Sequence, residues 1–523
     1  MRNYNKKRSK AEKLILLLFM VFVFFSLTSV IITDYKPDNL VLLDYYPITP
    51  EIISLRERID AILEDYASFE YTIGLKIVSI DVPQIFYELD SDLALAPASN
   101  LKVITSAAGF ELLGADFQWT TDFFVSPANN LYIRASGDPT WSDSYSRNRL
   151  NNITKSIADS LKSHGFSTIN NIIVSPSGFN SAELGLGWRL ENRLHAYSAK
   201  SSALAFNDNS VQIRISPTTA GSNARINLHP VNAGFKVINN VRTTTNRNSQ
   251  GFNFSAEQDS NTVTVMGNIW VNSRPQYRTI AVPRPDLYSL DVLSGKLKEY
   301  GIRINGRIYH DTLLPRDISS NRYEKKFSLY SPPLYEVAEE INKRSNNFIT
   351  NQLFLTIEDQ NTWSVDSEKI IKQWLLSQNA VVDSLKMYDG SGLSYLNTTT
   401  ADLLVDVLRI MSKSEWADEF KMSMAISGID GTLKNALNDE RLNNRVYAKT
   451  GFISGVRGLT GYIYTQENEL LAFSFIVNKE GSRITNFNRI IERVLIELFE
   501  FKRDIYISGD TNADKSKRYT LHI

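Results

Sequence analysis

The hydrophobic pattern changes twice along the chain, and this constrains the fold more than any other feature of the sequence. Glu51–Phe69 has the period of an amphipathic helix, and Tyr71–Ile80 and Ile85–Leu89 predict a two-stranded hairpin. The C-terminal part predicts three strands and a last amphipathic helix, at Val446–Lys449, Leu459–Tyr464, Leu470–Val477 and Arg483–Phe501. Because strands from both ends need partners, we expect one mixed sheet made from both ends and flanked by helices, in the α/β (α+β) class.

The middle of the chain has a different pattern. From about residue 117 to 309, short alternating stretches between Gly, Asn, Asp and Ser residues predict strands at Asn130–Ala135, Val211–Ser216, Thr262–Val271 and Ile302–Tyr309. Helical periods then resume at Leu334–Lys343, Phe348–Ile357, Ser367–Ser377 and Thr399–Met411. Since 523 residues are too many for one ordinary core, we expect a β-rich insert, with one module nested inside another.

The first 32 residues have the composition of a membrane segment. Six lysines and arginines fall within residues 1–13, and the uncharged stretch Leu14–Ile32 follows. As a helix this stretch is about 28 Å long, close to the thickness of a bilayer's hydrocarbon core. The basic side stays in the cytoplasm, so the rest of the chain is expected outside it, in the periplasm or cell envelope. We expect an uncleaved anchor in the inner membrane, with a cleaved signal peptide as the alternative.

The composition excludes several classes of site. Lysine and arginine together number 57, as do aspartate and glutamate, so net charge does not favour a nucleic-acid partner. The chain has no cysteine, hence no disulfide, thiolate metal site or thiol nucleophile. Its five histidines are scattered without metal-ligand spacing, so we expect no metal and no other cofactor, and most Ser-His-Asp triads are excluded.

A serine and a lysine lie three residues apart in Ser99-Asn-Leu-Lys102, one helical turn from each other. Pro97 precedes them, and an apolar helical pattern continues to Gly114, a C-cap residue, so Ser99 is expected at a helix start. The Ser99 hydroxyl needs a base, and Lys102 can be that base only if burial or a second cation lowers its pKa. The pattern therefore predicts a partner lysine elsewhere. The alternative is an ordinary helix start with a solvated lysine.

Further polar clusters follow in the C-terminal half. Ser345-Asn346-Asn347 falls at a break between two helical stretches, where a hydroxyl and an amide can face a cleft. Lys449-Thr450-Gly451 ends a predicted strand and supplies the second cation. Two glycine-rich loops, 389–394 and 428–433, carry additional polar groups, and we interpret Asp389 and Asp430 as residues that shape these loops.

Ser-x-x-Lys, Ser-x-Asn and Lys-Thr-Gly in this order resemble the signature of penicillin-recognising serine enzymes. More closely, the chain is similar to the D-alanyl-D-alanine carboxypeptidase/endopeptidase family, the low-molecular-mass class C penicillin-binding proteins. The shared motifs are Pro97-Ala-Ser-x-x-Lys-Val-Ile-Thr105, Gly137-Asp-Pro139, Gly187-Trp188, Ser202-Ala-Leu-x-Phe-Asn207, Ser331-Pro-Pro-Leu334, Asp389-Gly-Ser-Gly-Leu393, Gly428-x-Asp-Gly-Thr-Leu433 and Lys449-Thr-Gly451. The resemblance covers about residues 50–500.

The resemblance implies a domain organisation. It implies a serine β-lactamase/D,D-peptidase-like core of residues 51–116 and 326–503, interrupted by two nested β-rich inserted domains. One would comprise residues 117–147 and 234–325, and the other residues 148–233. The remaining parts are an N-terminal transmembrane anchor or signal peptide, a linker and a polar tail, at residues 1–33, 34–50 and 504–523.

The resemblance also implies roles for the three motifs. Ser99 would attack the carbonyl carbon of the D-Ala-D-Ala bond, with Lys102 as its base, held neutral partly by Lys449. Ser345 would relay a proton to the leaving nitrogen, and Asn347 would hold a backbone amide of the substrate.

The strand motif would bind the substrate backbone. Lys449 and Thr450 would bind the terminal carboxylate, and Gly451 would let the substrate lie along the strand edge. The backbone N–H groups of Ser99 and Phe452 would form the oxyanion hole.

Three positions differ from the family pattern or have an alternative role. Phe452 stands where relatives usually have a small residue or Met, so the pocket beside it should differ. Trp188 and Glu191 match a Trp and an acid that in relatives receive the side chain of the stem peptide and its terminal amine. Surface packing is the alternative role for both residues.

The implied function is a metal-free serine-type D-Ala-D-Ala carboxypeptidase or D,D-endopeptidase that acts on peptidoglycan stem peptides and is inhibited by β-lactams. The alternatives are an idle peptidoglycan-binding scaffold and a β-lactamase. The sequence leaves open the preference between carboxypeptidase and endopeptidase activity, the side chain preferred in the stem peptide, and the oligomeric state.

Overall fold

The structure is a computed structural model that describes residues 48–66, 70–175, 184–231, 234–257, 259–311, 323–358, 366–479 and 484–503. The expected anchor at residues 14–32, most of the linker and the polar tail lie outside these residues. Within the described ranges, none of the helices combines the length and the apolar character needed to span a bilayer.

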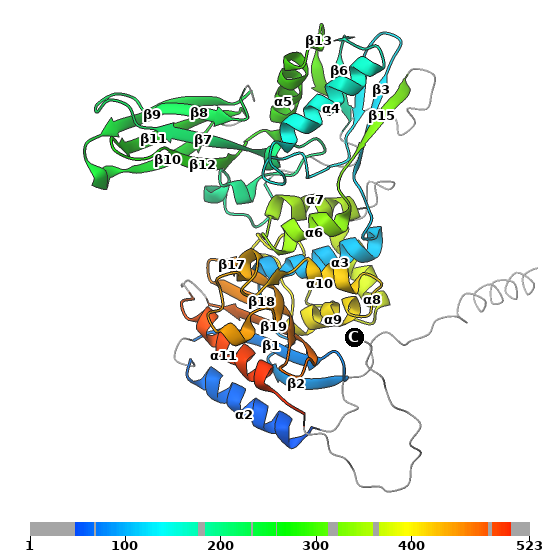
Figure 1. Ribbon diagram of the computed structural model, residues 1–523, viewed down its shortest axis with the longest axis vertical. Helices are drawn as coiled ribbons and strands as arrows, with labels where there is room; N and C mark the ends of the chain where they lie inside the picture. Colours follow the sequence, from blue (N-terminus) through cyan, green and yellow to red (C-terminus); the bar gives the residue numbers. More distant parts are fainter. Residues whose placement is uncertain are drawn as a thin grey trace, which may run out of the picture. The chain divides into compact units, whose positions relative to one another are not determined.

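Strands from both ends of the chain form one sheet, as the sequence predicts. In the described chain it has six strands in the order β16-β17-β18-β19-β1-β2. Their bounds are Ala425–Ile426, Val446–Ile453, Val456–Tyr464, Leu470–Asn478, Thr72–Ser79 and Gln84–Leu89. In Figure 1, β1 and β2 from the N-terminal part lie beside β18 and β19 from the C-terminal part.

The expectation of a mixed sheet is wrong, because all pairs in this sheet are antiparallel. Short turns join β1 to β2, β17 to β18 and β18 to β19, and strands joined in this way can pair only in opposite directions. Parallel pairs need a crossover connection of a dozen or more residues.

Helices cover both faces of the six-stranded sheet. α2 (Pro50–Glu64) and α11 (Phe487–Glu500) pack with Phe473 and Phe475 of β19 on one face. α3 (Leu101–Leu113) and α9 (Ala401–Met411) pack with Ala472 and Ile476 on the other face. This alternation explains why the last strand is apolar at every position from Leu470 to Val477 except the buried Ser474, since both of its faces are covered.

The remaining helices of the core extend the layer around α3. They are α6 (Leu334–Asn342), α7 (Asn347–Ile357), α8 (Ser367–Ser377) and α10 (Ala417–Met422), and their buried side chains join the same hydrophobic cluster. The predicted helices at 334–343, 348–357, 367–377 and 399–411 are confirmed with small shifts at their ends.

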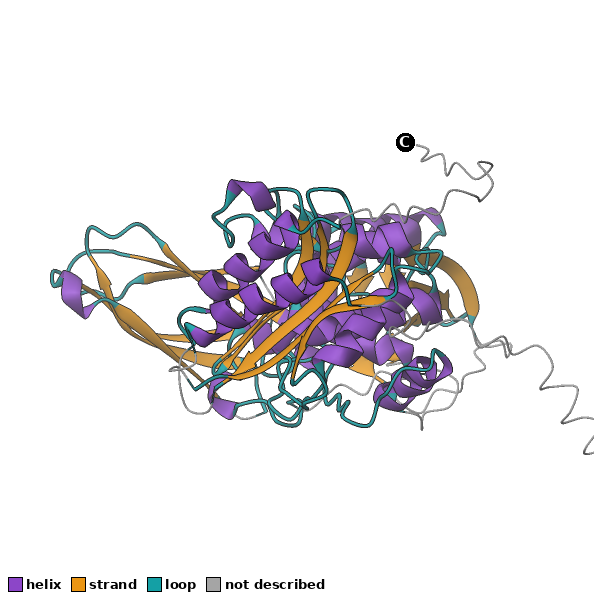
Figure 2. Cartoon of the chain, turned by 90° about the horizontal axis from the view of Figure 1, so that it is seen from below, coloured by secondary structure: helices purple, strands orange, loops and turns teal. Residues whose placement is uncertain are grey.

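The insert is an α/β structure, and it is less purely β than the sequence suggests. Among the described residues it contains a five-stranded sheet in the order β14-β6-β4-β3-β15, at Ile308–His310, Ile172–Ser175, Leu131–Arg134, Thr120–Val125 and Glu324–Tyr330. α4 (Arg149–Ser163) and α5 (Pro285–Glu299) share a core with this sheet. In Figure 2, long strands of the insert extend to the left.

Two three-stranded sheets and one strand pair complete the described insert. The sheets have the orders β12-β7-β8 and β10-β11-β9, and the pair is β13-β5. The bounds from β5 to β13, leaving out β6, are Thr168–Ile169, Ser210–Ser216, Arg225–His229, Lys236–Thr244, Gly251–Ala256, Thr262–Trp270, Gln276–Ala281 and Arg303–Ile304.

The expected strand at Ile302–Tyr309 is interrupted between β13 and β14. The backbone N–H groups of Asn305 and Gly306 bond to Ile169 and Asn170 there, so the two short strands join different sheets. The domain boundaries stay a prediction, and strand pairing crosses the boundary at residue 148, since β6 pairs with β4.

Candidate active site

Ser99 lies in a tight turn at the start of α3. The turn is a short 3₁₀ helix, η3 (Ala98–Asn100), that leads directly into α3, whose C-cap is Gly114 with a φ of 90°. Ala98 has a φ of 48°, a left-handed conformation that is unfavourable for a residue with a Cβ. Such strain is kept where the surrounding structure fixes the chain, and here it orients the half-buried Ser99.

Lys102 lies one turn along α3 and is completely buried. Its Nζ is 3.0 Å from the Ser99 Oγ, 2.7 Å from the Asn347 Oδ1 and 2.6 Å from the carbonyl oxygen of Ser391. The last two oxygens can only accept hydrogen bonds, so they hold two hydrogens of the amine. In the neutral amine, the lone pair is then left for the Ser99 hydroxyl.

Burial lowers the pKa of Lys102 to about 7, while the negative charge of Asp389 acts in the opposite direction. Burial is also the main cause that lowers the pKa of Lys449, and the positive charge of Lys102 lowers it further. The sequence analysis attributed part of the lowered pKa of Lys102 to the charge of Lys449. In the structure, desolvation is the main reason why Lys102 loses its proton near neutral pH.

Lys449 lies on β17 and is also completely buried. Its Nζ donates to the Ser345 Oγ at 2.9 Å and to the carbonyl oxygen of Thr450 at 2.8 Å. The neighbour β16 pairs with β17 at Tyr447 and Ala448. From Lys449 to Ile453, that edge of β17 has no strand partner within the described part of the chain, so it can accept an added strand.

Ser345 and Asn347 occupy the break between α6 and α7. Ser345 has a φ of 58°, and the Asn346 side chain caps α7 by accepting the N–H of Ile349 at 3.1 Å. Asn347 reaches Lys102 with its Oδ1, while its Nδ2 donates to the carbonyl oxygen of Tyr197 at 3.0 Å. The break therefore aligns the hydroxyl with one lysine and the amide with the other.

The first and third motifs touch through their backbones. A Cβ built on Gly451 would lie 2.9 Å from the carbonyl oxygen of Pro97, and one on Gly458 would collide with the Asn100 side chain. These glycines allow β17 and β18 to approach the Ser99 turn directly. The sequence predicts this proximity because Lys102 needs a second cation nearby, which Lys449 supplies. The approach is possible because Gly451 and Gly458 have no side chains.

The loop at 389–394 closes the other side of the Ser99 turn. Asp389 Oδ1 accepts the N–H groups of Ser391, Gly392 and Leu393, and its Oδ2 accepts that of Ser394. This set of hydrogen bonds, the loop cage, orients the Ser391 carbonyl oxygen toward the Lys102 Nζ. The prediction that Asp389 shapes a loop fits these contacts, but no side-chain signal in the sequence pointed to the backbone acceptor it positions.

A cavity of about 560 Å³ lies over these groups, and Ser99, Ser345, Asn347, Thr450 and Phe452 line it. Among the described residues, no cluster of three or more histidines and acids could hold a metal. The arrangement is a hydroxyl beside a buried amine, with a second buried amine next to a hydroxyl. It can supply a nucleophile, its base and a proton relay without a metal.

The structure does not bring Trp188 and Glu191 into this cavity lining. The Trp188 Nε1 donates instead to the Asp389 Oδ2 at 2.8 Å, and Glu191 is exposed on η4 (Leu190–Asn192). Their assignment to a substrate pocket stays a prediction. Residues between and after them line the cavity, and sequence reasoning did not select them: Arg189, Asn192, Tyr197 and Tyr395.

Arg189 and Tyr395 form a pair at this cavity, with the guanidinium 4.4 Å from the ring centre. Phe452, the residue that departs from the family pattern, is 64% exposed, and the Arg457 guanidinium lies 3.7 Å from its ring centre. Its side chain therefore stays at the cavity rim, where it can change the pocket without displacing β17.

The motifs and their geometry can now be compared with known proteins. A family model described as the D-Ala-D-Ala carboxypeptidase 3 (S13) family matches residues 55–496. The chain belongs to this family. The resemblance stated from the motifs is thereby confirmed.

Relatives in this family match over most of their lengths. The D-alanyl-D-alanine carboxypeptidase of Actinomadura sp. (strain R39) is 28% identical over 82% of this chain and 81% of its own. DacB of Haemophilus influenzae, a D-alanyl-D-alanine carboxypeptidase, is 25% identical over 83% and 90% of the two chains.

Solved structures share the fold. Penicillin binding protein 4 (dacB) from Haemophilus influenzae has a TM-score of 0.72 at 22% identity, covering 86% of this chain and 100% of its own. The same protein complexed with a novel β-lactam has a TM-score of 0.67 at 20% identity, over 87% and 100% of the two chains.

Proposed function

We propose that this chain is a serine-type D-Ala-D-Ala carboxypeptidase that acts on peptidoglycan stem peptides through an acyl-enzyme at Ser99. The observation that carries the proposal is the 3.0 Å approach of the buried Lys102 amine to the Ser99 hydroxyl, together with a pKa of about 7 for that amine. A base whose pKa lies near the working pH is the most effective at removing a proton.

Acylation begins at the hydroxyl. The Ser99 Oγ attacks the carbonyl carbon of the penultimate D-alanine, and its proton passes to the Lys102 Nζ. A bond forms between oxygen and carbon, and the carbonyl oxygen becomes an oxyanion. The backbone N–H groups of Ser99 and Phe452 would stabilise this charge, at about 3 kcal/mol for each donor.

The leaving group departs on the Ser345 side. The bond between the carbonyl carbon and the amide nitrogen breaks, and the nitrogen takes a proton through the Ser345 hydroxyl. The proton that reaches the nitrogen is the one that Lys102 took from Ser99, so Lys102 is neutral again, and Lys449, which donates to the Ser345 Oγ at 2.9 Å, orients the relay hydroxyl. Water then attacks the ester carbonyl carbon and gives a proton to Lys102, which passes it to the Ser99 Oγ as the ester bond breaks, so the acid is released and Ser99 is regenerated.

Binding follows from the free edge of β17. A stem peptide would add to this edge as an antiparallel strand, with its terminal carboxylate near Lys449 and Thr450 and one of its amides on Asn347. The family, the β-lactam complex of penicillin binding protein 4 and this edge together support inhibition by β-lactams.

The finer assignments belong to the same proposal. We include D,D-endopeptidase cleavage of cross-links, and an extracytoplasmic location with residues 14–32 as a membrane anchor, since the substrate lies outside the cytoplasm.

Release of D-alanine from a pentapeptide ending in D-Ala-D-Ala tests the proposal. The full chain, purified in detergent, should release one D-alanine for each peptide, and Ser99→Ala should reduce the rate at least about 1000-fold. No release by the wild type would contradict the proposal and favour an idle scaffold. Rapid hydrolysis of penicillin without release of D-alanine would favour a β-lactamase.

A further inference from the structure

A second cavity adjoins the catalytic one. It has a volume of about 400 Å³, and Tyr197, Ser345 and Asn347 line both cavities. Ser345 is the residue that faces the leaving nitrogen in the proposed reaction. The second cavity therefore lies on the leaving-group side of the cleaved bond.

The far wall of the second cavity belongs to the sheet β12-β7-β8. Gln212 of β7, His229 of β8 and Thr279 of β12 line the cavity. In the strand register, Gln212 stands opposite both His229 and Thr279, so the three side chains share one face of the sheet. All three are exposed, and this face continues outward from the cavity.

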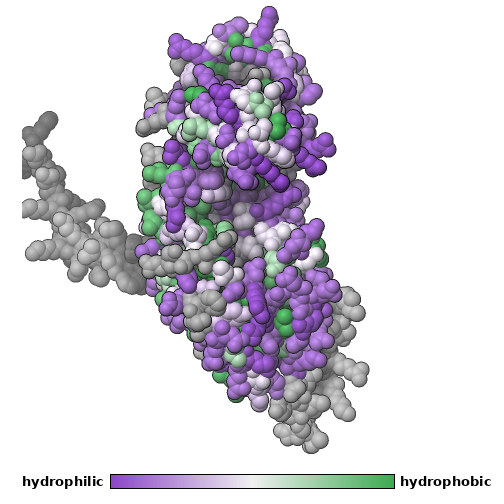
Figure 3. Space-filling view, turned by 90° about the vertical axis from the view of Figure 1, so that its left-hand side faces the viewer, coloured by the Kyte–Doolittle hydropathy of each residue, from purple (hydrophilic) through white to green (hydrophobic). Residues whose placement is uncertain are grey.

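The next positions on the same face are basic and aromatic. Arg214 stands opposite Asn227 on β8 and Tyr277 on β12, and Arg225 stands opposite Ser216. Arg214, Arg225 and Tyr277 are exposed. Figure 3 views the molecule from the side on which these strands lie in Figure 1, and hydrophilic side chains predominate there.

These two arginines lack acidic partners. Neither Arg214 nor Arg225 makes an ion pair with any described residue, whereas Arg441 and Arg493 are paired with carboxylates. Residues 210–282 contain seven lysines and arginines and two acids, in a chain whose charges balance overall. The positive charge is thus segregated on this part of the insert.

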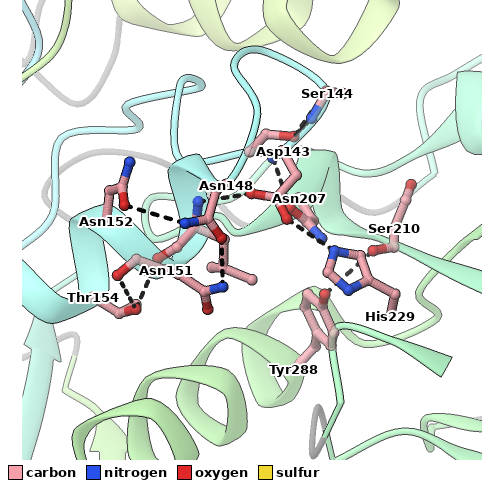
Figure 4. A network of polar contacts seen from close by, with 12 residues as sticks. Asp143, Ser144, Asn148, Asn151, Asn152, Thr154, Asn207, Ser210, His229 and Tyr288 are labelled. Carbon is pink, nitrogen blue, oxygen red and sulfur yellow. Dashed lines mark hydrogen bonds and ion pairs between the residues drawn. The ribbon is translucent and has the colours of Figure 1, made fainter. Parts of the chain in front are cut away.

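The cavity between this face and Ser345 has the opposite character. The His229 Nε2 lies 2.8 Å from the Asp143 Oδ2, and Asn207 accepts the backbone N–H of Asp143 (Figure 4). Asp208 accepts the Ser144 hydroxyl at 2.6 Å, and its second oxygen is buried without a hydrogen-bond partner among the described residues. The two carboxyl groups give this part of the cavity an acidic lining, which suits N–H groups of a ligand better than carboxylates.

We propose that the second cavity and the exposed face of β8-β7-β12 bind the second peptidoglycan strand of a cross-linked substrate, the strand that carries the leaving amine. This rests on the proposed function. Amide and amine N–H groups of that strand would face Asp143 and Asp208, and free carboxylates of its stem peptides would pair with Arg214 and Arg225. Continuity with Ser345 favours this strand over a lipid surface, which would not need a path to the site.

The test compares substrates with and without a second strand. Kinetics with a cross-linked peptide dimer and with a single pentapeptide give a ratio of the two kcat/KM values. In the double variant Arg214→Gln/Arg225→Gln, the ratio should fall about 3- to 10-fold, the effect of two exposed charge pairs. The control Lys298→Gln/Arg489→Gln removes two exposed positive charges on α5 and α11 and should keep the ratio.

Binding without turnover separates this inference from the proposed function. In a Ser99→Ala background, the charge variant should sediment less with purified sacculi at low salt than the control variant, and the difference should vanish at high salt. An unchanged ratio or unchanged sedimentation overturns the inference. The inference is also overturned if the charge variant loses only its binding to phosphatidylglycerol vesicles, a result that would indicate a lipid surface. Failure of the wild type to release D-alanine would instead overturn the proposed function, while the sedimentation result still stands.

Discussion

Lys102 is the residue on which the chemistry depends. An ordinary lysine is protonated at neutral pH and cannot take a proton from serine. Complete burial lowers the pKa of Lys102 to about 7, so that a large fraction of the amine is neutral under ordinary conditions. Two acceptor oxygens, from Asn347 and Ser391, orient the amine toward Ser99.

This pKa predicts a pH dependence. The neutral amine is the active form, so kcat/KM for a pentapeptide should rise with pH and reach half of its plateau near pH 7. Lys102→Arg, which stays charged, should be inactive at every pH between 5 and 9. A rate that is flat across pH 5–9, or an active arginine variant, would remove Lys102 as the base.

Asp389 provides a second prediction at the residue level. Its negative charge raises the pKa of Lys102, so Asp389→Asn should move the half-maximal pH lower. The variant also loses one acceptor oxygen of the loop cage, so its free energy of unfolding should fall by about 1–3 kcal/mol. Asp430→Asn is the matched control, since Asp430 pairs with Lys343 in the other glycine-rich loop and should leave the half-maximal pH in place. A pH profile and urea unfolding measure both effects.

At the level of elements, the site depends on backbones that approach closely. The Ser99 turn is enclosed by β17 and β18 on one side and by the loop at 389–394 on the other. Gly392 has a φ of 79°, and a Cβ built on it would collide with the carbonyl oxygen of Ala98. The loop and the turn therefore fit only because Gly392 lacks a side chain.

Gly392→Ala should displace the Ser99 turn and slow acylation by penicillin about 10- to 100-fold. Gly221→Ala is the control: its φ of 85° is similar, but no atom lies within 4 Å of the added Cβ. It should cost about 1–2 kcal/mol of unfolding free energy and keep the acylation rate. Stopped-flow acylation with a fluorescent penicillin measures the rates. Equal slowing in both variants would show that backbone strain, and not the contact, is responsible.

Several elements could be predicted because their pattern is dictated by burial. β19 is mostly apolar and buried on both faces, and α9 has a regular apolar stripe, so both were expected close to their observed bounds. α4 was missed although its buried Leu150, Ile153, Ile157 and Leu161 follow a helical period. Many of its other positions are Asn, Ser and Thr, which have weak helix propensity and resemble a loop.

The candidate site, too, could be predicted only in part from the sequence. Side-chain chemistry predicted that Ser99, Lys102, Ser345, Asn347 and Lys449 belong together, and their contacts agree with this. The carbonyl oxygens of Ser391 and Tyr197 were not predictable, because every residue has one and only the fold selects which are used. The antiparallel direction of the core sheet depends on turns, which the strand pattern does not specify.

At the scale of the whole molecule, the insert is tied to the helix that carries Asn347. Gln352 on α7 is completely buried, and its Nε2 donates to the carbonyl oxygens of Gly137 and Ser202, at 2.8 and 2.9 Å. Its Oε1 accepts the N–H of Ser202 at 3.2 Å. One side chain thus satisfies three backbone groups of the insert from a helix of the core.

Gln352→Leu should leave these backbone groups unsatisfied and reduce the free energy of unfolding by about 2–4 kcal/mol. Because α7 begins at Asn347, the variant should also raise the KM for a pentapeptide more than it lowers kcat. Gln352→Glu keeps one acceptor oxygen, so its free energy of unfolding should lie between those of the wild type and Gln352→Leu. Urea unfolding followed by circular dichroism, with steady-state kinetics, checks both effects. Wild-type stability in Gln352→Leu would contradict this role.

The central claim is that Ser99 is the nucleophile and that a buried amine activates it. Mass spectrometry of the full chain after exposure to penicillin tests it most directly, with Ser99→Ala as the control. We predict that the wild type gains the mass of one penicillin on the peptide that contains Ser99 and that the control gains none. An unmodified wild type, or an adduct on any other residue, would contradict the account.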